Sequence, residues 1–85
     1  MNEVFEALSD KNRRKILEIL KKRDMSAGEI LKFFDITGAS LSHHLNILNK
    51  AELVTSEKKG RYVFYSLNTS FLEAVLKEFF DKLKK

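Results

Sequence analysis

The spacing of the apolar residues changes twice along this chain, and that change constrains the fold more than any other feature. Up to about residue 51, apolar side chains recur every three or four positions, as on one face of an amphipathic helix. The run Tyr62-Val63-Phe64-Tyr65 is instead aromatic and β-branched, which favours an extended strand. Helical spacing returns after Asn68. The pattern therefore predicts a mainly helical chain with one β-hairpin near its C-terminal end.

Four helices are predicted before the hairpin, over residues 2–8, 11–23, 27–34 and 39–51. Ser26 and Glu29 have the spacing of a capping box and mark the start of the third helix. Leu41, Leu45 and Leu48 then form a single stripe along the fourth helix. A short helix, a tight turn and a second helix in this order indicate a helix–turn–helix over about 26–51.

The hairpin and a last helix complete the predicted domain. Two strands over about 53–67 turn at Lys59-Gly60, and the last helix runs over about 70–84. Asn68, Thr69 and Ser70 are all possible N-caps of this helix, and Ser70 with Glu73 has the spacing of a capping box. The predicted order is α-α-α-α-β-β-α, an α+β class that is mainly α. We therefore expect a single winged helix–turn–helix domain over residues 1–85.

Length and composition exclude several classes of protein. Eighty-five residues suffice for one compact domain, and the composition, 44% hydrophobic and 33% charged, is that of a folded chain. No apolar run is long enough to span a membrane and no signal peptide is visible, so we expect a cytoplasmic protein without a membrane partner. The absence of cysteine excludes thiolate catalysis and cysteine-based metal sites. No nucleophile–base pair is visible, so neither an enzyme nor a cofactor is expected.

Charge is distributed unevenly, and its distribution indicates an anionic partner. The chain has 16 Lys+Arg against 12 Asp+Glu, a formal charge of +4. No acidic residue lies between Asp35 and Glu52, or between Glu57 and Glu73. Carboxylates are thus missing where a helix in the major groove and a wing would approach phosphates. Double-stranded DNA is the predicted partner.

The fourth helix should present small polar side chains opposite its leucine stripe. Ser40, Ser42, His43 and Asn46 can hydrogen-bond to base edges or phosphates, and Ala39 permits close approach to a thymine methyl group. The structural alternative is that serines near a helix start act as caps. His44 lies nearer the leucine stripe and is predicted to pack or to hydrogen-bond inside the protein.

Further contacts to the DNA backbone are predicted around this helix. Thr37 and the free N–H groups of the helix start can hold a phosphate, and Ser26 can do so at the preceding helix. Lys58, Lys59 and Arg61 at the hairpin tip can reach the backbone or the minor groove. The alternative for such a tip is an ordinary solvated turn.

The last helix is apolar over about half of its circumference, whereas a stripe that faces one core is typically about 100° wide. A two-fold homodimer would bury the excess and would set two recognition helices about 34 Å apart, one turn of DNA. A thickened protomer core is the alternative. The residues predicted to form the dimer interface are Val4, Phe5, Leu8, Phe71, Leu72, Val75, Leu76, Phe79, Phe80 and Leu83.

Three segments resemble the ArsR-type winged-helix repressors. They are the opening Ala7-Leu8-Ser9-Asp10 with Arg13-Arg14-Lys15-Ile16-Leu17, the run Ser40-x-Ser42-x-His44-Leu45-x-x-Leu48, and the wing run from Lys59 to Leu67. The resemblance implies a dimeric prokaryotic repressor that binds an inverted repeat near a promoter. Lys11 is a departure, since relatives usually have proline there.

Many members of that family sense metals, and this sequence departs from their pattern. It has no cysteine pair before the turn and no histidine in the last helix, and its two histidines, His43 and His44, are adjacent on one helix. The chain therefore looks more like the short, metal-ligand-free SdpR-like branch, and no metal is predicted. An unidentified protein or small-molecule effector stays open, because an apolar seam between protomers can hide a pocket.

Two other functions are alternatives to specific DNA binding. A winged helix can serve as a protein-interaction module, for which Phe33 and Ile47, apolar residues left outside the predicted core, offer a small contact. The second alternative is non-specific binding, either to RNA or as an architectural protein. Exposed apolar or acidic residues on the fourth helix and wing would favour the interaction module, and neither kind dominates there.

Overall fold

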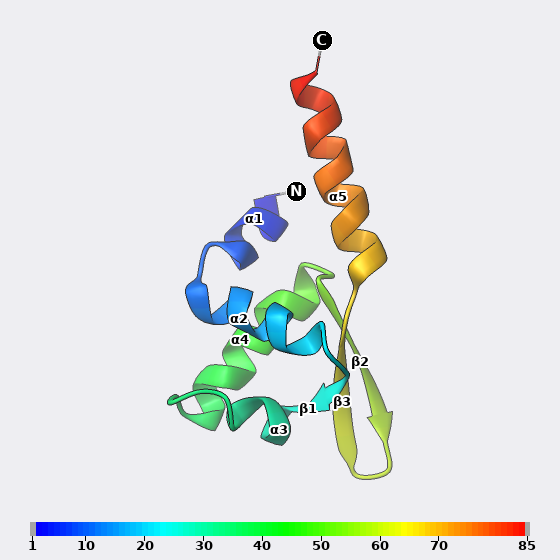
Figure 1. Cartoon of the computed structure of the whole chain (residues 1–85). Helices are drawn as coiled ribbons and strands as arrows, with labels where there is room; N and C mark the ends of the chain where they lie inside the picture. Colours follow the sequence, from blue (N-terminus) through cyan, green and yellow to red (C-terminus); the bar gives the residue numbers. More distant parts are fainter. Residues whose placement is uncertain (1, 85) are drawn as a thin grey trace.

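The computed structural model describes residues 2–84, and its fold is the predicted winged helix–turn–helix (Figure 1). Met1 and Lys85, the ends of the predicted domain, lie outside the described residues. The elements in chain order are α1 (Asn2–Leu8), α2 (Lys11–Leu20), β1 (Met25–Ser26), α3 (Ala27–Leu31), α4 (Gly38–Lys50), β2 (Val54–Lys59), β3 (Tyr62–Leu67) and α5 (Thr69–Leu83).

The sheet has one strand more than the sequence predicted. Strand β1 pairs with β3 so that the three strands lie antiparallel in the order β1-β3-β2. In this pairing Met25 lies opposite Tyr65, and Ser26 opposite Phe64. The predicted order α-α-α-α-β-β-α is therefore corrected to α-α-β-α-α-β-β-α. Helix α2 ends at Leu20 rather than near residue 23, which leaves room for the chain to enter β1.

The hairpin turns one residue later than predicted. Val54 pairs with Leu67 at one end of the ladder and Lys59 with Tyr62 at the other, so the loop consists of Gly60 and Arg61. Gly60 has a φ of 63° and Arg61 does not take a positive φ. A positive φ at the first loop position is what a type II′ turn requires, and glycine adopts it without steric cost.

The core lies between α2, α4 and the base of the hairpin. The predicted stripe of Leu41, Leu45 and Leu48 is almost fully buried, as are Ile16 of α2 and Ile30 of α3. Each apolar side chain of this size contributes roughly 1.5–3 kcal/mol when it is fully buried. The stripe thus fixes which face of α4 remains exposed.

Side-chain caps set the helix boundaries. The predicted capping box of Ser26 and Glu29 is present at α3. Thr37 Oγ1 accepts from the backbone N–H of Ser40 at 3.0 Å and starts α4. At α5 the capping box of Ser70 and Glu73 was a wrong prediction, because the cap is Asn68, whose Oδ1 accepts from the N–H of Phe71 at 3.3 Å. Helix α5 therefore begins at Thr69, one residue earlier than predicted.

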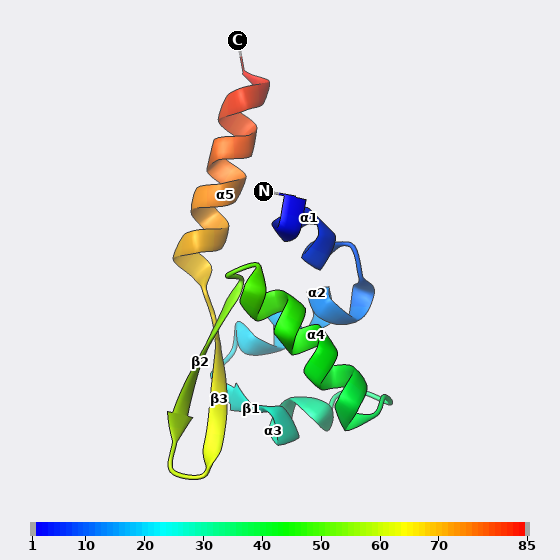
Figure 2. The same ribbon diagram turned by 180° about the vertical axis from the view of Figure 1, so that it is seen from behind.

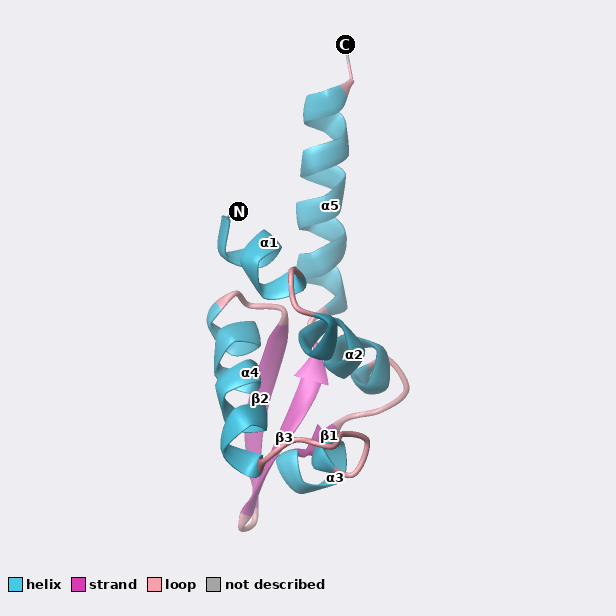
Figure 3. Ribbon diagram, turned by 90° about the vertical axis from the view of Figure 1, so that its left-hand side faces the viewer, coloured by secondary structure: helices cyan, strands magenta, loops and turns pink. Residues whose placement is uncertain are grey.

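The molecule is elongated, 49 × 25 × 20 Å, and its two ends differ (Figures 1 and 2). Helices α1 and α5 lie at one end, whereas α3, the start of α4 and the hairpin tip lie at the other. Figure 3 shows that α5 extends well past α1. No helix within residues 2–84 is long and apolar enough to cross a membrane.

Candidate nucleic-acid interface

Helix α4 exposes the polar face that the sequence predicted. Ala39, Ser42, His43 and Asn46 are exposed, on the side away from the buried leucines. Ser40 is half-buried, and its backbone N–H is already bound by Thr37. None of these four side chains is long or acidic, so a base edge could approach the helix closely.

The N-terminus of α4 is open to solvent. Thr37 and Gly38 are exposed, and open space surrounds the position that a Cβ of Gly38 would occupy. The first turn contains no acidic side chain to offset the positive end of the helix dipole. A phosphate could therefore approach the free N–H groups of this turn.

The hairpin presents cations on both of its faces. Lys58 pairs with Val63 and Lys59 with Tyr62, and since successive strand residues point to opposite faces, the two lysines diverge. Lys59 Nζ lies 5.7 Å from the ring centre of Phe64. Arg61 lies in the exposed loop. We use the name α4/wing surface for eight exposed residues at the N-cap of α4, on its polar face and at the hairpin tip, namely Thr37, Ala39, Ser42, His43, Asn46, Lys58, Lys59 and Arg61.

Ser26 does not fit the role of a phosphate contact well. Its hydroxyl accepts from the N–H of Glu29 at 3.3 Å, and its own N–H donates to the Glu29 carboxylate at 3.0 Å. That hydrogen bond, helped by Arg23 at 3.3 Å, holds the pKa of Glu29 below its ordinary value, so the carboxylate stays ionised. A phosphate at Ser26 would meet this negative charge. The structure gives Ser26 a capping role, and its contact with DNA stays a prediction.

Tyr62 is a candidate contact that the sequence analysis missed. The run Tyr62-Val63-Phe64-Tyr65 indicates only a strand, but Tyr62 is 57% exposed beside the loop residue Arg61. With Lys32 and Phe64 it lines a hollow between α3 and the hairpin. A tyrosine hydroxyl can donate to a phosphate. In the sequence, the position of Tyr62 directly after Gly60 and Arg61 was the signal that could have indicated this contact.

The two histidines have different surroundings, as predicted. His43 is exposed, whereas the side chain of His44 is 12% exposed and its Nδ1 lies 3.2 Å from Arg13 Nη1. The ring centres are 6.0 Å apart. Within residues 2–84, no three His, Cys, Asp or Glu side chains are grouped so that they could hold a metal ion.

The opposite end of the molecule exposes apolar side chains. Phe5, Phe80 and Leu83 are 39%, 58% and 65% exposed. Phe79 contacts Phe5 edge-to-face, with ring centres 5.4 Å apart, and so joins α5 to α1. We call these residues, with the partly buried Leu8 and Leu76, the α1/α5 surface.

Part of the predicted dimer face is occupied within the protomer. Val4 is 3% exposed and belongs to the core, so the expectation that it adds to an exposed apolar patch is wrong. Phe71, Leu72 and Val75 are partly buried against the same core. The first half of α5 therefore covers its own domain, and the second half carries most of the exposed apolar area.

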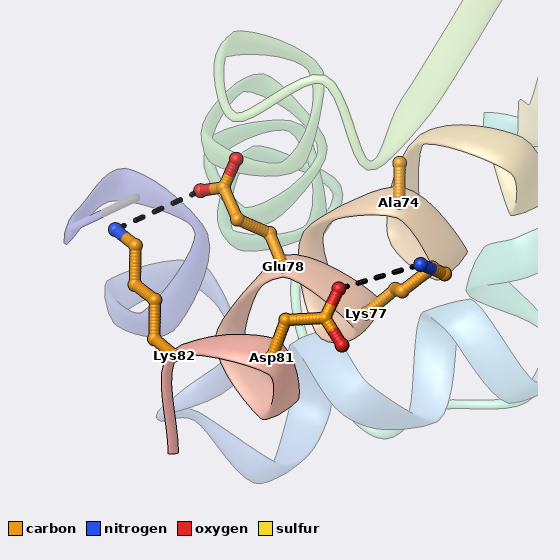
Figure 4. Close-up of a pocket in the computed structure, with 5 residues that line it drawn as sticks. All are labelled: Ala74, Lys77, Glu78, Asp81 and Lys82. Carbon is orange, nitrogen blue, oxygen red and sulfur yellow. Dashed lines mark hydrogen bonds and ion pairs between the residues drawn. The ribbon is translucent and has the colours of Figure 1, made fainter. Parts of the chain in front are cut away.

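The other side of α5 is charged. Lys77 Nζ lies 3.3 Å from Asp81 Oδ2, and Lys82 Nζ lies 3.9 Å from Glu78 Oε1 (Figure 4). These i, i+4 pairs and Ala74 line a shallow hollow on the helix. Exposed pairs of this kind contribute little to stability and mark a solvated face. Helix α5 thus has one charged, solvent-exposed face and one apolar face.

The chain matches the family model described as "Bacterial regulatory protein, arsR family" over residues 10–56, more than half of its length. It is 53% identical over 73 residues to the transcriptional repressor SdpR of Bacillus subtilis, and the aligned region covers 86% of this chain and 81% of that protein. It is 35% identical over 75 residues to the arsenical resistance operon repressor of Staphylococcus xylosus, covering 88% of this chain and 72% of the relative.

Solved structures of ArsR-type regulators are also similar to this chain. A crystal structure of an ArsR family transcriptional regulator superimposes with a TM-score of 0.85 at 26% identity, covering 96% of this chain and 84% of the other. An ArsR-like transcriptional regulator from Rhodococcus gives a TM-score of 0.75 at 31% identity, with coverage of 96% and 84%. The chain therefore belongs to the ArsR family of bacterial regulatory proteins.

Proposed function

We propose that this protein is a DNA-binding transcriptional repressor that acts as a homodimer on an inverted-repeat operator. The observation that carries the proposal is the placement of the α4/wing surface at one end of the domain and of the α1/α5 surface at the other. One end offers hydrogen-bonding groups and cations to DNA. The other offers apolar area that a second copy can bury. Membership of the ArsR family and the similarity to named repressors support it.

The two parts of the α4/wing surface would contribute differently to binding. Helix α4 enters a major groove, where Ser42, His43 and Asn46 contact base edges and set the sequence preference. Lys59 and Arg61 contact phosphates or the minor groove beside it and raise affinity without reading sequence. The start of α4 at Thr37 holds a further phosphate. In the dimer, the two α4/wing surfaces contact the two half-sites of the operator.

The second copy would pack against the α1/α5 surface. Phe80 and Leu83 are too exposed to be needed by the protomer core, and a contiguous patch of exposed apolar side chains marks an interaction surface. A two-fold axis through this surface gives a closed dimer, with both α4/wing surfaces presented to one duplex. Repression then follows because the bound dimer excludes RNA polymerase from the promoter.

A protein-interaction module is the second candidate. Phe33 is 48% exposed and supports it, since an exposed phenylalanine can anchor a protein partner. However, Ile47 is half-buried against the core, and the exposed face of α4 is polar. We therefore favour DNA as the partner of α4 and the wing.

Selection of bound sites from random duplex DNA, with the mass of the protein measured on the same sample, tests the proposal. We expect an enriched inverted repeat with half-sites about one helical turn apart. The protein should have twice the chain mass of 9.9 kDa. Salt-sensitive binding without any enriched sequence would instead favour the interaction module.

A further inference from the structure

Arg13 is a charged side chain that the fold buries, with only 9% of its surface exposed. It is the one charged side chain among the buried residues of α2. Its Nε donates to the carbonyl oxygen of Ala7 at 2.8 Å, and its Nη2 donates to that of Glu6 at 3.1 Å. Both carbonyls belong to the last turn of α1, where a helix leaves its C=O groups without intrahelical partners.

The third contact of Arg13 reaches the recognition helix. Its Nη1 lies 3.2 Å from Nδ1 of His44 in α4. A guanidinium group has only donors, so Nδ1 of His44 is the acceptor in this contact. Asp10 Oδ2, which caps α2, lies 4.0 Å from the same nitrogen. One buried side chain of α2 thus joins the end of α1 to the middle of α4.

We propose that Arg13 is a positioning residue, which fixes α4 for base readout by tying His44 to the C-terminal carbonyls of α1. The inference rests on the proposed function, because it concerns the same DNA-binding surface. It adds a physical connection between that surface and α1, whose Phe5 and Leu8 belong to the α1/α5 surface.

The hydrogen bond from Arg13 adds a directional constraint to the apolar packing of α4. The leucine stripe buries α4 but is non-directional, so it tolerates small rotations about the helix axis. The bond from Arg13 is directional, and its donor is held in place by the two carbonyls of α1. His44 directly follows the base-reading candidate His43 in sequence. Base contacts need atoms placed to within about 0.5 Å, so a loss of this bond should reduce specificity first.

Two substitutions of His44 test the proposal while leaving Arg13 and α1 unchanged. His44→Leu fills a similar volume without an acceptor, whereas His44→Asn places an amide oxygen near the position of Nδ1. We expect His44→Leu to lower affinity for the selected inverted repeat about tenfold, the usual cost of losing a hydrogen bond to a charged group. Affinity for unrelated duplex should change less than about twofold, since phosphate contacts tolerate small shifts. His44→Asn should restore operator affinity to within about threefold of the original.

Two results would overturn the proposal. Equal losses in both variants would show that the His44 ring itself is required, and unchanged affinity in both would show that the bond does not position α4. Thermal unfolding of each variant verifies that it is folded at the assay temperature.

Amide hydrogen exchange of α4 in the DNA-free protein separates this proposal from the proposed function. His44→Leu should speed exchange in the middle of α4, and His44→Asn should not. This outcome is expected even if no operator is enriched, so failure to bind specific DNA and failure of the Arg13 connection remain distinguishable. Equal exchange in all three proteins contradicts the connection.

Discussion

The two ends of this domain expose opposite chemistry on helices of similar length. The 13-residue helix α4 buries its leucines completely and exposes short polar groups, whereas the 15-residue helix α5 buries no residue fully and exposes Phe80 and Leu83. Both helices are amphipathic, so amphipathicity alone does not separate them. The difference is how much of each apolar face the protomer itself covers.

That difference indicates what each end contacts. An apolar stripe fully covered by the protomer leaves a polar face, which suits a hydrated, hydrogen-bonding partner such as DNA. A stripe wider than the protomer can cover suits another apolar surface, and a second copy provides one. Substitutions that exchange or remove these properties therefore test the comparison.

The largest effect on operator affinity is expected when the α1/α5 surface is made polar. Phe80→Glu should leave the protomer folded, because Phe80 is 58% exposed, but should prevent burial of the α1/α5 surface. Linking two half-site contacts raises affinity by at least about 100-fold, so operator binding should fall by about that factor. Light scattering and operator titration measure the two consequences. Lys77→Ala, on the charged side of the same helix, is the control and should remain dimeric.

Next in size are substitutions on the exposed face of α4. Ser42→Ala or His43→Ala should each cost about 1–3 kcal/mol of operator affinity and relax the sequence preference, because a base contact is lost. Competition between the selected site and single-base variants measures this. If either substitution weakened all duplexes equally, its side chain would be a phosphate contact rather than a base contact.

A smaller effect is expected in the connection between the two ends. Asp10→Ala should destabilise the protein by about 1 kcal/mol, because Asp10 Oδ2 caps α2 by accepting from the N–H groups of Asn12 and Arg13. Chemical denaturation measures it, and Asp10→Asn, which keeps an accepting oxygen, should lose less. A full loss in Asp10→Asn would show that charge rather than the cap matters.

The same carboxylate should make stability depend on acid pH. Burial raises the pKa of Asp10, but the two backbone N–H bonds and the nearby charge of Arg13 outweigh it, so the pKa lies below its ordinary value. A depressed folded-state pKa means that the stabilisation is present above about pH 4 and is lost as the pH falls further. Unfolding curves of Asp10→Asn should show a smaller decline over that range.

The smallest effect is expected at the wing. Lys59→Ala or Arg61→Ala should weaken specific and non-specific DNA about equally and lower the magnitude of the salt slope by about one, because one phosphate contact is removed. Titrations at several salt concentrations measure the slope. Lys82→Ala, a cation at the other end of the molecule, should leave the slope unchanged, and a similar change there would mean that net charge rather than the wing is responsible.

The parts of the fold that sequence predicted are those governed by local periodicity. The stripe of Leu41, Leu45 and Leu48, the capping box at Ser26 and the hairpin all follow from neighbouring residues. Strand β1 was missed because two residues carry no periodic pattern, and its pairing with β3 depends on tertiary contact. The sequence left the cap of α5 open among three adjacent residues, Asn68, Thr69 and Ser70, and only the structure shows that Asn68 is the cap.

Burial was harder to predict than secondary structure. Val4 and Phe5 are adjacent on α1, and only the packing of α1 against the core shows that the first is buried and the second half-exposed. The burial of Arg13 was not predictable, because its partners are two backbone carbonyl oxygens, those of Glu6 and Ala7, and His44, which is distant in sequence. The exposed face of α4 was predictable because its buried face was unambiguous.

The central claim, that two α4 helices are held at a fixed separation by the α1/α5 surface, is tested most directly by changing the distance between the half-sites of the selected repeat. Five inserted base pairs rotate one half-site by about half a turn of the duplex. The account predicts that affinity falls about 100-fold, to that of a single half-site, and that ten inserted base pairs do not restore it fully because the separation has grown. Unchanged affinity for the repeat with five inserted base pairs would contradict it, since each protomer would then bind its half-site independently.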